Sequence, residues 1–274
     1  MKFFRSRPPE PELRKPAPAK LPDLPTVRVG ALYRGARIGG DFYDFIQVGS
    51  SRLLVLLLDI AGKRAEALHI AAAVQDVFHG SADIFYNDTV NEPVAITSVL
   101  LDINRGIMEA AGGVRCAPAF LGCYNEVLGT CCYINAGHTP ALLKHDGQVD
   151  TLEASGLPLG LFSHATHDAQ ICALPHSAAL VMVSRGLVEA KAHKEEFGME
   201  RVKQALKEAS GHDAQQLCHH LLDSLREFLE AQKKNRLFDR GSQQIAETDP
   251  LGDNDTTAIA LVRSAVAMAM TIES

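Results

Sequence analysis

The most informative stretch of the sequence is residues 39–63, which read GGDFYDFIQVGSSRLLVLLLDIAGK. Two apolar segments of strand length, 42–48 and 53–59, flank a Gly-Ser-Ser-Arg turn, and this pattern predicts a β-hairpin. Asp41 comes just before the first segment, and Asp59 ends the second, which is the most apolar strand of the chain. The two acids therefore lie at strand ends, where a carboxylate can face a site.

The segments around this hairpin predict an α+β fold. Residues 27–33 alternate loosely, as in a strand, whereas 64–78 and 92–110 carry apolar residues at helical spacing. Two amphipathic helices are expected at 196–209 and 214–230, and residues 231–252 are polar and predicted to form a loop. Short turns between strands favour antiparallel pairing, so we expect a sandwich of two antiparallel sheets flanked by helices. The remaining strands are expected at 119–125, 131–135, 141–144, 149–152, 171–174, 179–184 and 256–262.

Composition and termini narrow the class of protein. The chain has 274 residues, 46% of them hydrophobic, and a net charge of −6, which is unlike the basic footprint of a nucleic-acid-binding protein. We expect no signal peptide and no membrane span, because the longest clean apolar run, 53–58, is far too short. Six cysteines without a Cys-x-x-Cys pair suggest free thiols in the cytoplasm. We expect a Pro-rich, disordered arm or linker at 1–26, one domain at 27–264 and a tail at 265–274.

Four acidic segments follow predicted strands or precede them. They are Gly-Gly-Asp-Phe-Tyr-Asp-Phe at 39–45, Asp-Ile-Ala-Gly-Lys at 59–63, Ser-Arg-Gly-Leu-Val-Glu-Ala at 184–190 and Asp-Asn-Asp-Thr-Thr at 253–257. Carboxylates from separate strand ends can converge on Mg²⁺ or Mn²⁺, which prefer hard oxygen ligands. Each segment alone is better explained as a turn or a helix cap. Their order and spacing together indicate a metal site.

At this point the chain resembles a known family. From about residue 29 to residue 263 it is similar to the PPM-type metal-dependent Ser/Thr protein phosphatases, in the branch of SpoIIE and RsbU. The matching segments are 39–45, 59–63, Asn-Ala-Gly-His-Thr-Pro-Ala-Leu-Leu at 135–143, Gly-Leu-Pro-Leu-Gly-Leu at 156–161, Glu-Phe-Gly-Met-Glu-Arg at 196–201 and 253–257.

The resemblance implies roles for particular residues. Asp59 would bridge two Mn²⁺ or Mg²⁺ ions, the Ile60 carbonyl would help hold the second, Asp253 would bind the first, and Asp41 would bind the second ion or its water. A hydroxide between the ions would attack a phosphoserine or phosphothreonine directly. The substrate would be a phosphoprotein, by analogy a STAS-type anti-anti-sigma factor.

Two further features bear on substrate and assembly. Lys63 and Arg64 begin a predicted helix near Asp59 and could meet the substrate phosphate, although a solvated helix start explains them equally well. The helices at 64–78 and 92–110 could supply the face of a homodimer.

One departure from the family pattern puts the chemistry in doubt. Where the family has a metal-binding aspartate in Thr-Asp-Gly, this chain has Ser184-Arg185-Gly186. An arginine stays protonated and cannot bind a cation, but it can pair with Asp59 and Asp253 in the place of an ion. Three outcomes stay open: a pseudophosphatase that binds a phosphoprotein or partner, an enzyme of weak activity with one metal, or compensation by Asp255 or Glu189.

Overall fold

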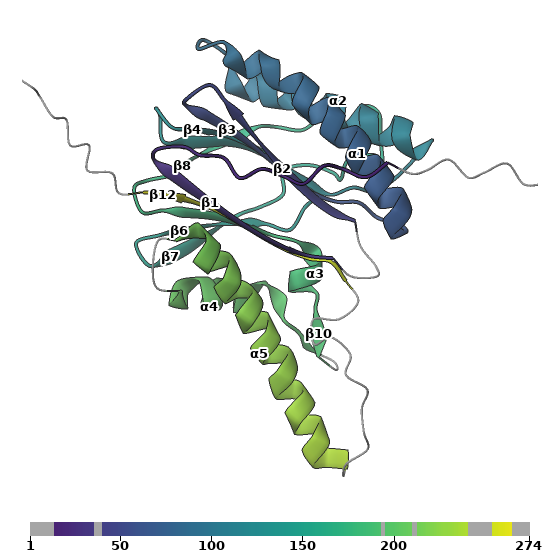
Figure 1. Ribbon diagram of the computed structural model, residues 1–274, viewed down its shortest axis with the longest axis vertical. Helices are drawn as coiled ribbons and strands as arrows, with labels where there is room; N and C mark the ends of the chain where they lie inside the picture. Colours follow the sequence, from purple (N-terminus) through teal and green to yellow (C-terminus); the bar gives the residue numbers. More distant parts are fainter. Residues whose placement is uncertain (1–13, 36–39, 193–194, 210–212, 241–253, 265–274) are drawn as a thin grey trace, which may run out of the picture.

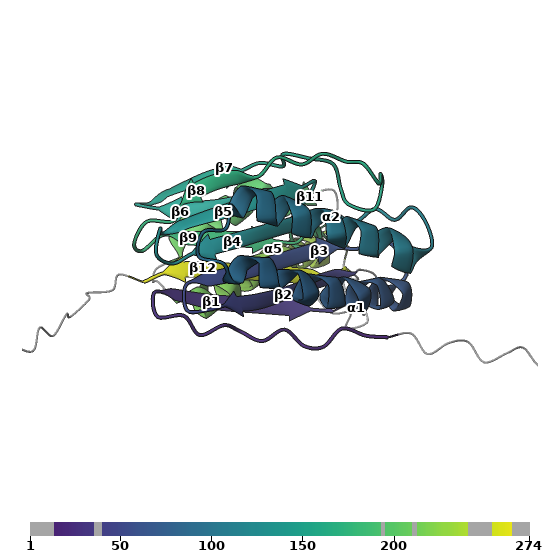
Figure 2. The same ribbon diagram turned by 90° about the horizontal axis from the view of Figure 1, so that it is seen from above.

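The computed structural model describes residues 14–35, 40–192, 195–209, 213–240 and 254–264, with 232–240 described as backbone. Two antiparallel five-stranded sheets lie face to face, and helices cover the outer face of each (Figures 1 and 2). This four-layer arrangement confirms the fold class expected from the sequence. Among the described residues, no helix combines the length and the apolar character needed to cross a bilayer.

The first sheet contains the hairpin of residues 41–59. Its strands, in spatial order, are β2 (Asp41–Val48), β3 (Arg52–Asp59), β4 (Ala119–Asn125), β5 (Thr130–Ala136) and β8 (Gln170–Ala173). Its outer face is covered by α1 (Arg64–Ser81), the short 3-10 helix η1 (Ala82–Tyr86) and α2 (Glu92–Ala111). Helix α2 begins with a capping bond, because the Asn91 side chain accepts from the backbone N–H of Val94, and ends at Gly112 in the left-handed conformation.

The second sheet is built from segments far apart in the sequence. Its strands, in spatial order, are β1 (Val27–Arg34), β12 (Thr256–Arg263), β9 (Ala179–Val183), β6 (Ala141–His145) and β7 (Gln148–Leu152). Its outer face is covered by α4 (Gly198–Glu208) and α5 (Ala214–Arg240). A four-residue helix, α3 (Arg185–Val188), follows β9, and the two-residue strands β10 (Lys191–Ala192) and β11 (Glu195–Glu196) pair beyond it.

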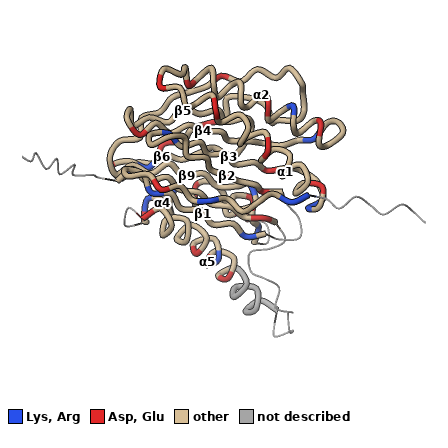
Figure 3. The backbone as a smooth tube through the Cα atoms, turned by 45° about the horizontal axis from the view of Figure 1, so that its top comes forward, with Lys and Arg blue, Asp and Glu red and all other residues tan. Residues whose placement is uncertain are grey.

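Strand β3 is buried on both faces, which explains why its sequence is apolar without alternation. Leu53, Val55 and Leu57 point into the layer between the two sheets. Leu54, Leu56 and Leu58 pack under α1 and α2. A third apolar cluster joins β9 and β12 to α4 and α5. Each sheet is thus held both by its partner sheet and by its own helices. Acidic and basic residues are interspersed over the described part of the chain (Figure 3).

Most predicted elements match the structure to within a few residues, and the exceptions have physical reasons. The prediction of a loop from residue 231 is wrong as far as Arg240, because α5 continues to that residue; residues 241–252 lie outside the described part. The polar composition suggests a loop, but Gln, Lys and Arg are good helix formers. The end of α5 extends away from the sheets (Figure 1). The sequence also did not predict η1, α3, β10 and β11, which are too short for a periodic signal.

The segment 14–26 contacts the domain although it holds almost no regular structure before β1 begins. Arg14 forms an ion pair with Asp76 of α1 at 2.7 Å, and the Gln75 side chain bonds both the N–H and the C=O of Ala17. Leu24 is buried in the layer between the sheets. The domain bounds expected from the sequence, 27–264, stay a prediction.

A buried ion pair ties the hairpin to the helical layer. Arg52, the first residue of β3, donates from Nε to Glu92 of α2 at 3.0 Å and from Nη1 to the carbonyl of Phe85 at 3.1 Å. Glu92 also accepts from the Asn125 amide at 2.7 Å. The Arg52 and Glu92 side chains are 8% and 11% exposed, so neither charge is well solvated.

Replacing Arg52 therefore tests how the layers are held together. We expect Arg52→Met to lower the free energy of unfolding by about 3 kcal/mol, because it leaves the Glu92 carboxylate buried without its counter-charge. Arg105→Met, which removes the exposed pair with Asp102 on the outer side of α2, should change it by less than about 1 kcal/mol. Urea denaturation of both variants measures this, and equal losses would contradict the interpretation.

Candidate active site

The hairpin register brings the first two predicted site residues together. Asp41 pairs with Asp59 across β2 and β3, and the two residues are 8% and 6% exposed. The chain then continues through Ile60, whose N–H donates to the carbonyl of Gly40 at 3.1 Å. A side chain at position 40 would place its Cβ 2.3 Å from the Ile60 carbonyl oxygen, so only glycine allows this close approach. The Ile60 carbonyl thus lies beside the start of β2, next to Asp41.

The second sheet supplies the opposite wall of the site. Ser184, at the end of β9, donates its N–H to the carbonyl of Thr257 in β12 at 2.9 Å. A Cβ on Gly186 would lie 1.9 Å from the carbonyl oxygen of Asp255, which explains the glycine after Arg185. These contacts bring Arg185 and Asp255 to the two aspartates of the hairpin. The resulting pocket has a volume of about 190 Å³ and is lined by Asp41, Asp59, Arg185, Gly186, Glu189, Asn254 and Asp255.

Each described aspartate of this pocket has a protein donor. Asp41 accepts from the Thr257 hydroxyl at 2.6 Å and also from Ser184. Asp59 accepts from Nε of Arg185 at 3.0 Å.

The third aspartate, Asp255, is held from the hairpin side and from β1. It accepts from Nη1 of Arg64 at 2.9 and 3.1 Å and from the Tyr33 hydroxyl at 3.0 Å. Nη2 of Arg64 also donates to the Tyr33 hydroxyl at 2.9 Å. Arg64 is thereby fixed at the edge of the pocket.

Burial sets the protonation of the two hairpin aspartates. Burial raises the pKa of Asp41 to about 7, against the opposing effect of the bonds from Ser184 and Thr257. Burial also raises the pKa of Asp59, and the adjacent Arg185 guanidinium counteracts this by favouring the carboxylate. Both the neutral and the charged form of Asp41 are therefore populated near neutral pH. The charged form of Asp59 is favoured by the cation of Arg185.

The structure thus brings together Asp41, Asp59, Ile60, Arg64 and Arg185 from the predicted set. Asp253 lies outside the described residues. Lys63 is exposed at the N-cap of α1. The sequence did not single out Tyr33, Ser184 or Thr257, whose hydroxyls hold the carboxylates; only their positions in strands next to acidic segments could have suggested them.

His138 stabilises the turn between β5 and β6. Its N–H donates to the Asn135 side chain at 2.9 Å, and its Nδ1 lies 3.0 Å from the Thr139 hydroxyl. Burial lowers the pKa of His138 to about 4, so the ring is neutral at physiological pH. A neutral, buried imidazole supports the turn that leads into β6.

The described residues fit one metal position better than two. Asp41, Asp59 and the Ile60 carbonyl offer hard oxygen atoms around a close backbone approach at Gly40, which suits Mg²⁺ or Mn²⁺. The first metal position implied by the resemblance does not fit, because Arg185 replaces its aspartate and its guanidinium contacts Asp59. Within the described residues, no group of three or more His, Cys, Asp or Glu has the arrangement of a metal cluster.

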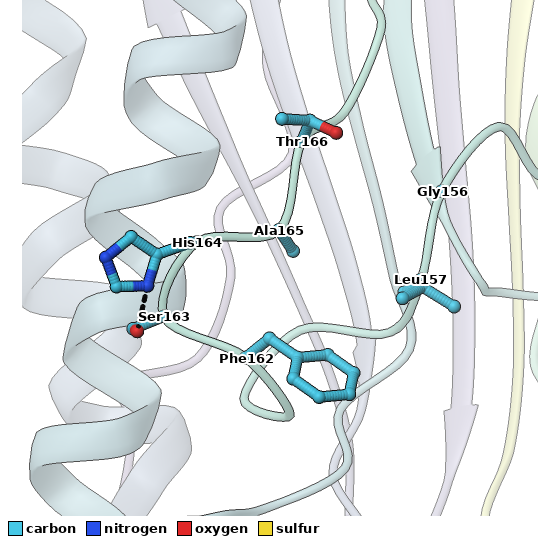
Figure 4. A pocket seen from close by; sticks show the side chains of 7 residues that line it. All are labelled: Gly156, Leu157, Phe162, Ser163, His164, Ala165 and Thr166. Carbon is cyan, nitrogen blue, oxygen red and sulfur yellow. Dashed lines mark hydrogen bonds between the residues drawn. The ribbon is translucent and has the colours of Figure 1, made fainter.

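A larger hollow lies elsewhere on the surface and has different chemistry. It has a volume of about 700 Å³ and is formed by the loop that carries Leu157, Phe162 and His164, with the first two more than half exposed (Figure 4). No carboxylate lines it. The acidic pocket is the better candidate for the active site although it is smaller, because it holds the carboxylates that can bind a metal ion.

The fold and the acidic pocket at the strand ends define the class: this is the architecture of the PPM-type protein phosphatases. The family model for stage II sporulation protein E (SpoIIE) matches residues 49–239, which is more than half of the chain. The chain therefore belongs to the SpoIIE family, as the resemblance predicted.

Three known proteins illustrate the relationship. The chain is 25% identical over 211 residues to Protein IcfG of Synechocystis, covering 69% of this chain and 33% of that protein. The solved RsbU and RsbW domains of Rv1364c from Mycobacterium tuberculosis superpose with a TM-score of 0.67 at 21% identity, over 88% of this chain and 62% of that one. The PP2C phosphatase domain and regulatory fragment of SpoIIE from Bacillus subtilis give 0.62 at 19% identity, over 87% and 64%. The chain thus spans only about a third of its curated relative.

The pKa of Asp41 leads to a prediction about stability and pH. Because this pKa is higher in the folded state than the ordinary value of 3.8, the folded protein holds a proton that the unfolded chain releases. The group therefore destabilises the fold increasingly from about pH 4 to about pH 7, and no further above that. In EDTA, Asp41→Asn should be more stable than the wild type at pH 8, and this advantage should exceed that at pH 5 by about 2–3 kcal/mol. Urea denaturation at both pH values measures it; an advantage independent of pH would contradict the assignment.

Proposed function

We propose that this chain is a phosphoserine/phosphothreonine protein phosphatase of the PPM type that works with one divalent ion. The ion would be Mn²⁺ or Mg²⁺, held by Asp41, Asp59 and the Ile60 carbonyl. The observation that carries the proposal is the pairing of Asp41 with Asp59 at one end of a hairpin whose register is fixed by burial. Membership of the SpoIIE family supports it.

The remaining residues of the pocket have defined tasks in this proposal. When bound, the ion would supply a water of lowered pKa and positive charge for the phosphate. Thr257 and Ser184 orient Asp41, and Tyr33 and Arg64 hold Asp255 at the opposite wall. Lys63, exposed at the start of α1, is free to meet the substrate phosphate, and we assign Arg64 to the same rim.

The substrate and setting follow from the family rather than from the pocket. We propose a phosphorylated signalling protein of the STAS-type anti-anti-sigma class as the substrate, acting in the cytoplasm. No feature of the proposal requires nucleic acid or a membrane. A homodimer through α1 and α2 is compatible with it, and the mass in solution decides that point.

A second candidate function is a pseudophosphatase that binds a phosphoprotein or partner without hydrolysing it. The contact between Arg185 and Asp59 favours it, because the guanidinium neutralises the carboxylate that would otherwise bridge the ions. Asp41 and Asp255 also have protein donors, so the described aspartates are satisfied without a metal. Calorimetric titration with Mn²⁺, with and without a phosphate-ester analogue, separates the candidates: one-site binding supports the phosphatase, and no binding under either condition supports the pseudophosphatase.

Hydrolysis itself gives a direct test. With Mn²⁺ present, we expect the chain to hydrolyse p-nitrophenyl phosphate and a phosphoserine protein slowly, and we expect Asp59→Asn to reduce kcat at least roughly 100-fold because the ion loses its main ligand. Asp223→Asn, which removes an exposed acid that pairs with Arg226 on α5, is the matched control and should leave the rate unchanged. A wild-type rate that neither EDTA nor Asp59→Asn reduces would refute a metal-dependent phosphatase.

Replacing Arg185 by the aspartate that the family has at this position tests whether the metal site lacks only this ligand. We expect Arg185→Asp to raise Mn²⁺-dependent hydrolysis at least roughly tenfold and to add a second Mn²⁺ in calorimetry, since it replaces a repelling cation with a ligand. The backbone around residue 185 should accept the change, because it is set by Ser184 and Gly186 rather than by the side chain. An unchanged rate and stoichiometry would mean that more than this ligand is missing.

A further inference from the structure

Arg185 reaches from the solvent-exposed rim of the pocket to its floor. Its side chain is 53% exposed, whereas the Asp59 side chain that it contacts is 8% exposed. The contact joins Nε of the guanidinium to Oδ2 of Asp59 at 3.0 Å. A guanidinium is a planar fork that binds a carboxylate or a phosphate with the same donors. Arg185 therefore has a second class of acceptor available wherever a phosphate enters this pocket.

The charges of the pocket oppose the entry of either ligand alone. Among the described residues, its lining holds the acids Asp41, Asp59, Glu189 and Asp255 and one cation, Arg185, while Arg64 pairs with Asp255 at its edge. A phosphate that enters alone meets an excess of negative charge and an arginine already bound to Asp59. A divalent cation that enters alone has to displace Arg185 from Asp59 and repels the guanidinium it has displaced.

The geometry points to an exchange of partners that resolves both conflicts: Arg185 is a phosphate-binding residue that releases Asp59 to the metal when it turns to the substrate. Two ion pairs replace one, since the carboxylate then faces the metal and the guanidinium faces the phosphate. Arg64 does not take this role in the exchange, because it stays on Asp255 and Tyr33. The inference rests on the proposed function, as it needs a metal position at Asp59.

This exchange makes the binding of metal and phosphate mutually dependent. If the phosphate raises the affinity for Mn²⁺ by a given factor, then Mn²⁺ raises the affinity for the phosphate by the same factor. Coupling of this kind ranges from about 5-fold to 150-fold in proteins. The pocket would thus hold its metal firmly only while a phosphorylated substrate is present.

The experiment measures Mn²⁺ binding calorimetrically with and without saturating phenylphosphonate, a non-hydrolysable phosphate-ester analogue. For the wild type we expect phenylphosphonate to tighten Mn²⁺ binding at least roughly fivefold. For Arg185→Gln we expect tighter Mn²⁺ binding than the wild type without the analogue, and little or no further gain with it. Complexation of the two reagents in solution affects both proteins equally, so the difference between them isolates Arg185.

Controls keep the inference separate from the proposed function. Arg226→Gln removes an exposed arginine of α5 and should behave as the wild type, and thermal melts check that every variant is folded. If Mn²⁺ binds the wild type equally well with and without phenylphosphonate, or if Arg185→Gln keeps the full coupling, the exchange is wrong while the metal position stands. If Mn²⁺ binds neither the wild type nor Arg185→Gln under any condition, the proposed metal position fails, and the exchange fails with it.

Discussion

The structure depends on the burial of β3 on both of its faces. A strand that is solvated on both faces can slip in register at small cost, but a strand packed between a second sheet and two helices cannot. The register of β2 against β3 is therefore fixed, and with it the position of Asp41 opposite Asp59. The acidic pocket is a consequence of this packing, since the hydrophobic core positions the two carboxylates before any ligand arrives.

A buried carboxylate destabilises the fold unless a counter-charge or hydrogen-bond donors compensate its charge. In the family pattern a pair of divalent ions provides this compensation, whereas here Arg185 provides part of it from within the chain. Hydroxyls from Ser184, Thr257 and Tyr33, together with the Arg64 guanidinium at Asp255, compensate the neighbouring acids. The raised pKa of Asp41 shows that this compensation is incomplete, because a fully balanced carboxylate would not retain its proton near pH 7.

The sequence predicted the parts of this structure that follow from periodicity and from short motifs. The hairpin 42–59, the helix α2 and the pocket acids Asp41 and Asp59 belong to this group, because each leaves a local pattern of apolar spacing or turn residues. The ordered motifs were enough to establish the family.

What the sequence could not predict depends on contacts between distant segments. Nothing near Tyr33 in the chain indicates that its hydroxyl meets Asp255, more than two hundred residues away. The same holds for the contact of Arg64 with Asp255 at the edge of the pocket, because the periodicity around Arg64 indicates only a helix start. The extension of α5 escapes prediction for another reason: the sequence from residue 231 is rich in polar residues, and a polar run resembles a loop even where its residues are good helix formers.

The close packing of Gly186 against the Asp255 carbonyl has an evolutionary consequence. The path of the backbone at this corner is determined by a glycine and by main-chain bonds, so it does not depend on which side chain precedes the glycine. Natural selection could therefore exchange a carboxylate for a guanidinium, or reverse that change, without rebuilding the loop. Descendants of one ancestral scaffold could in this way diverge between hydrolysis and recognition through a single position.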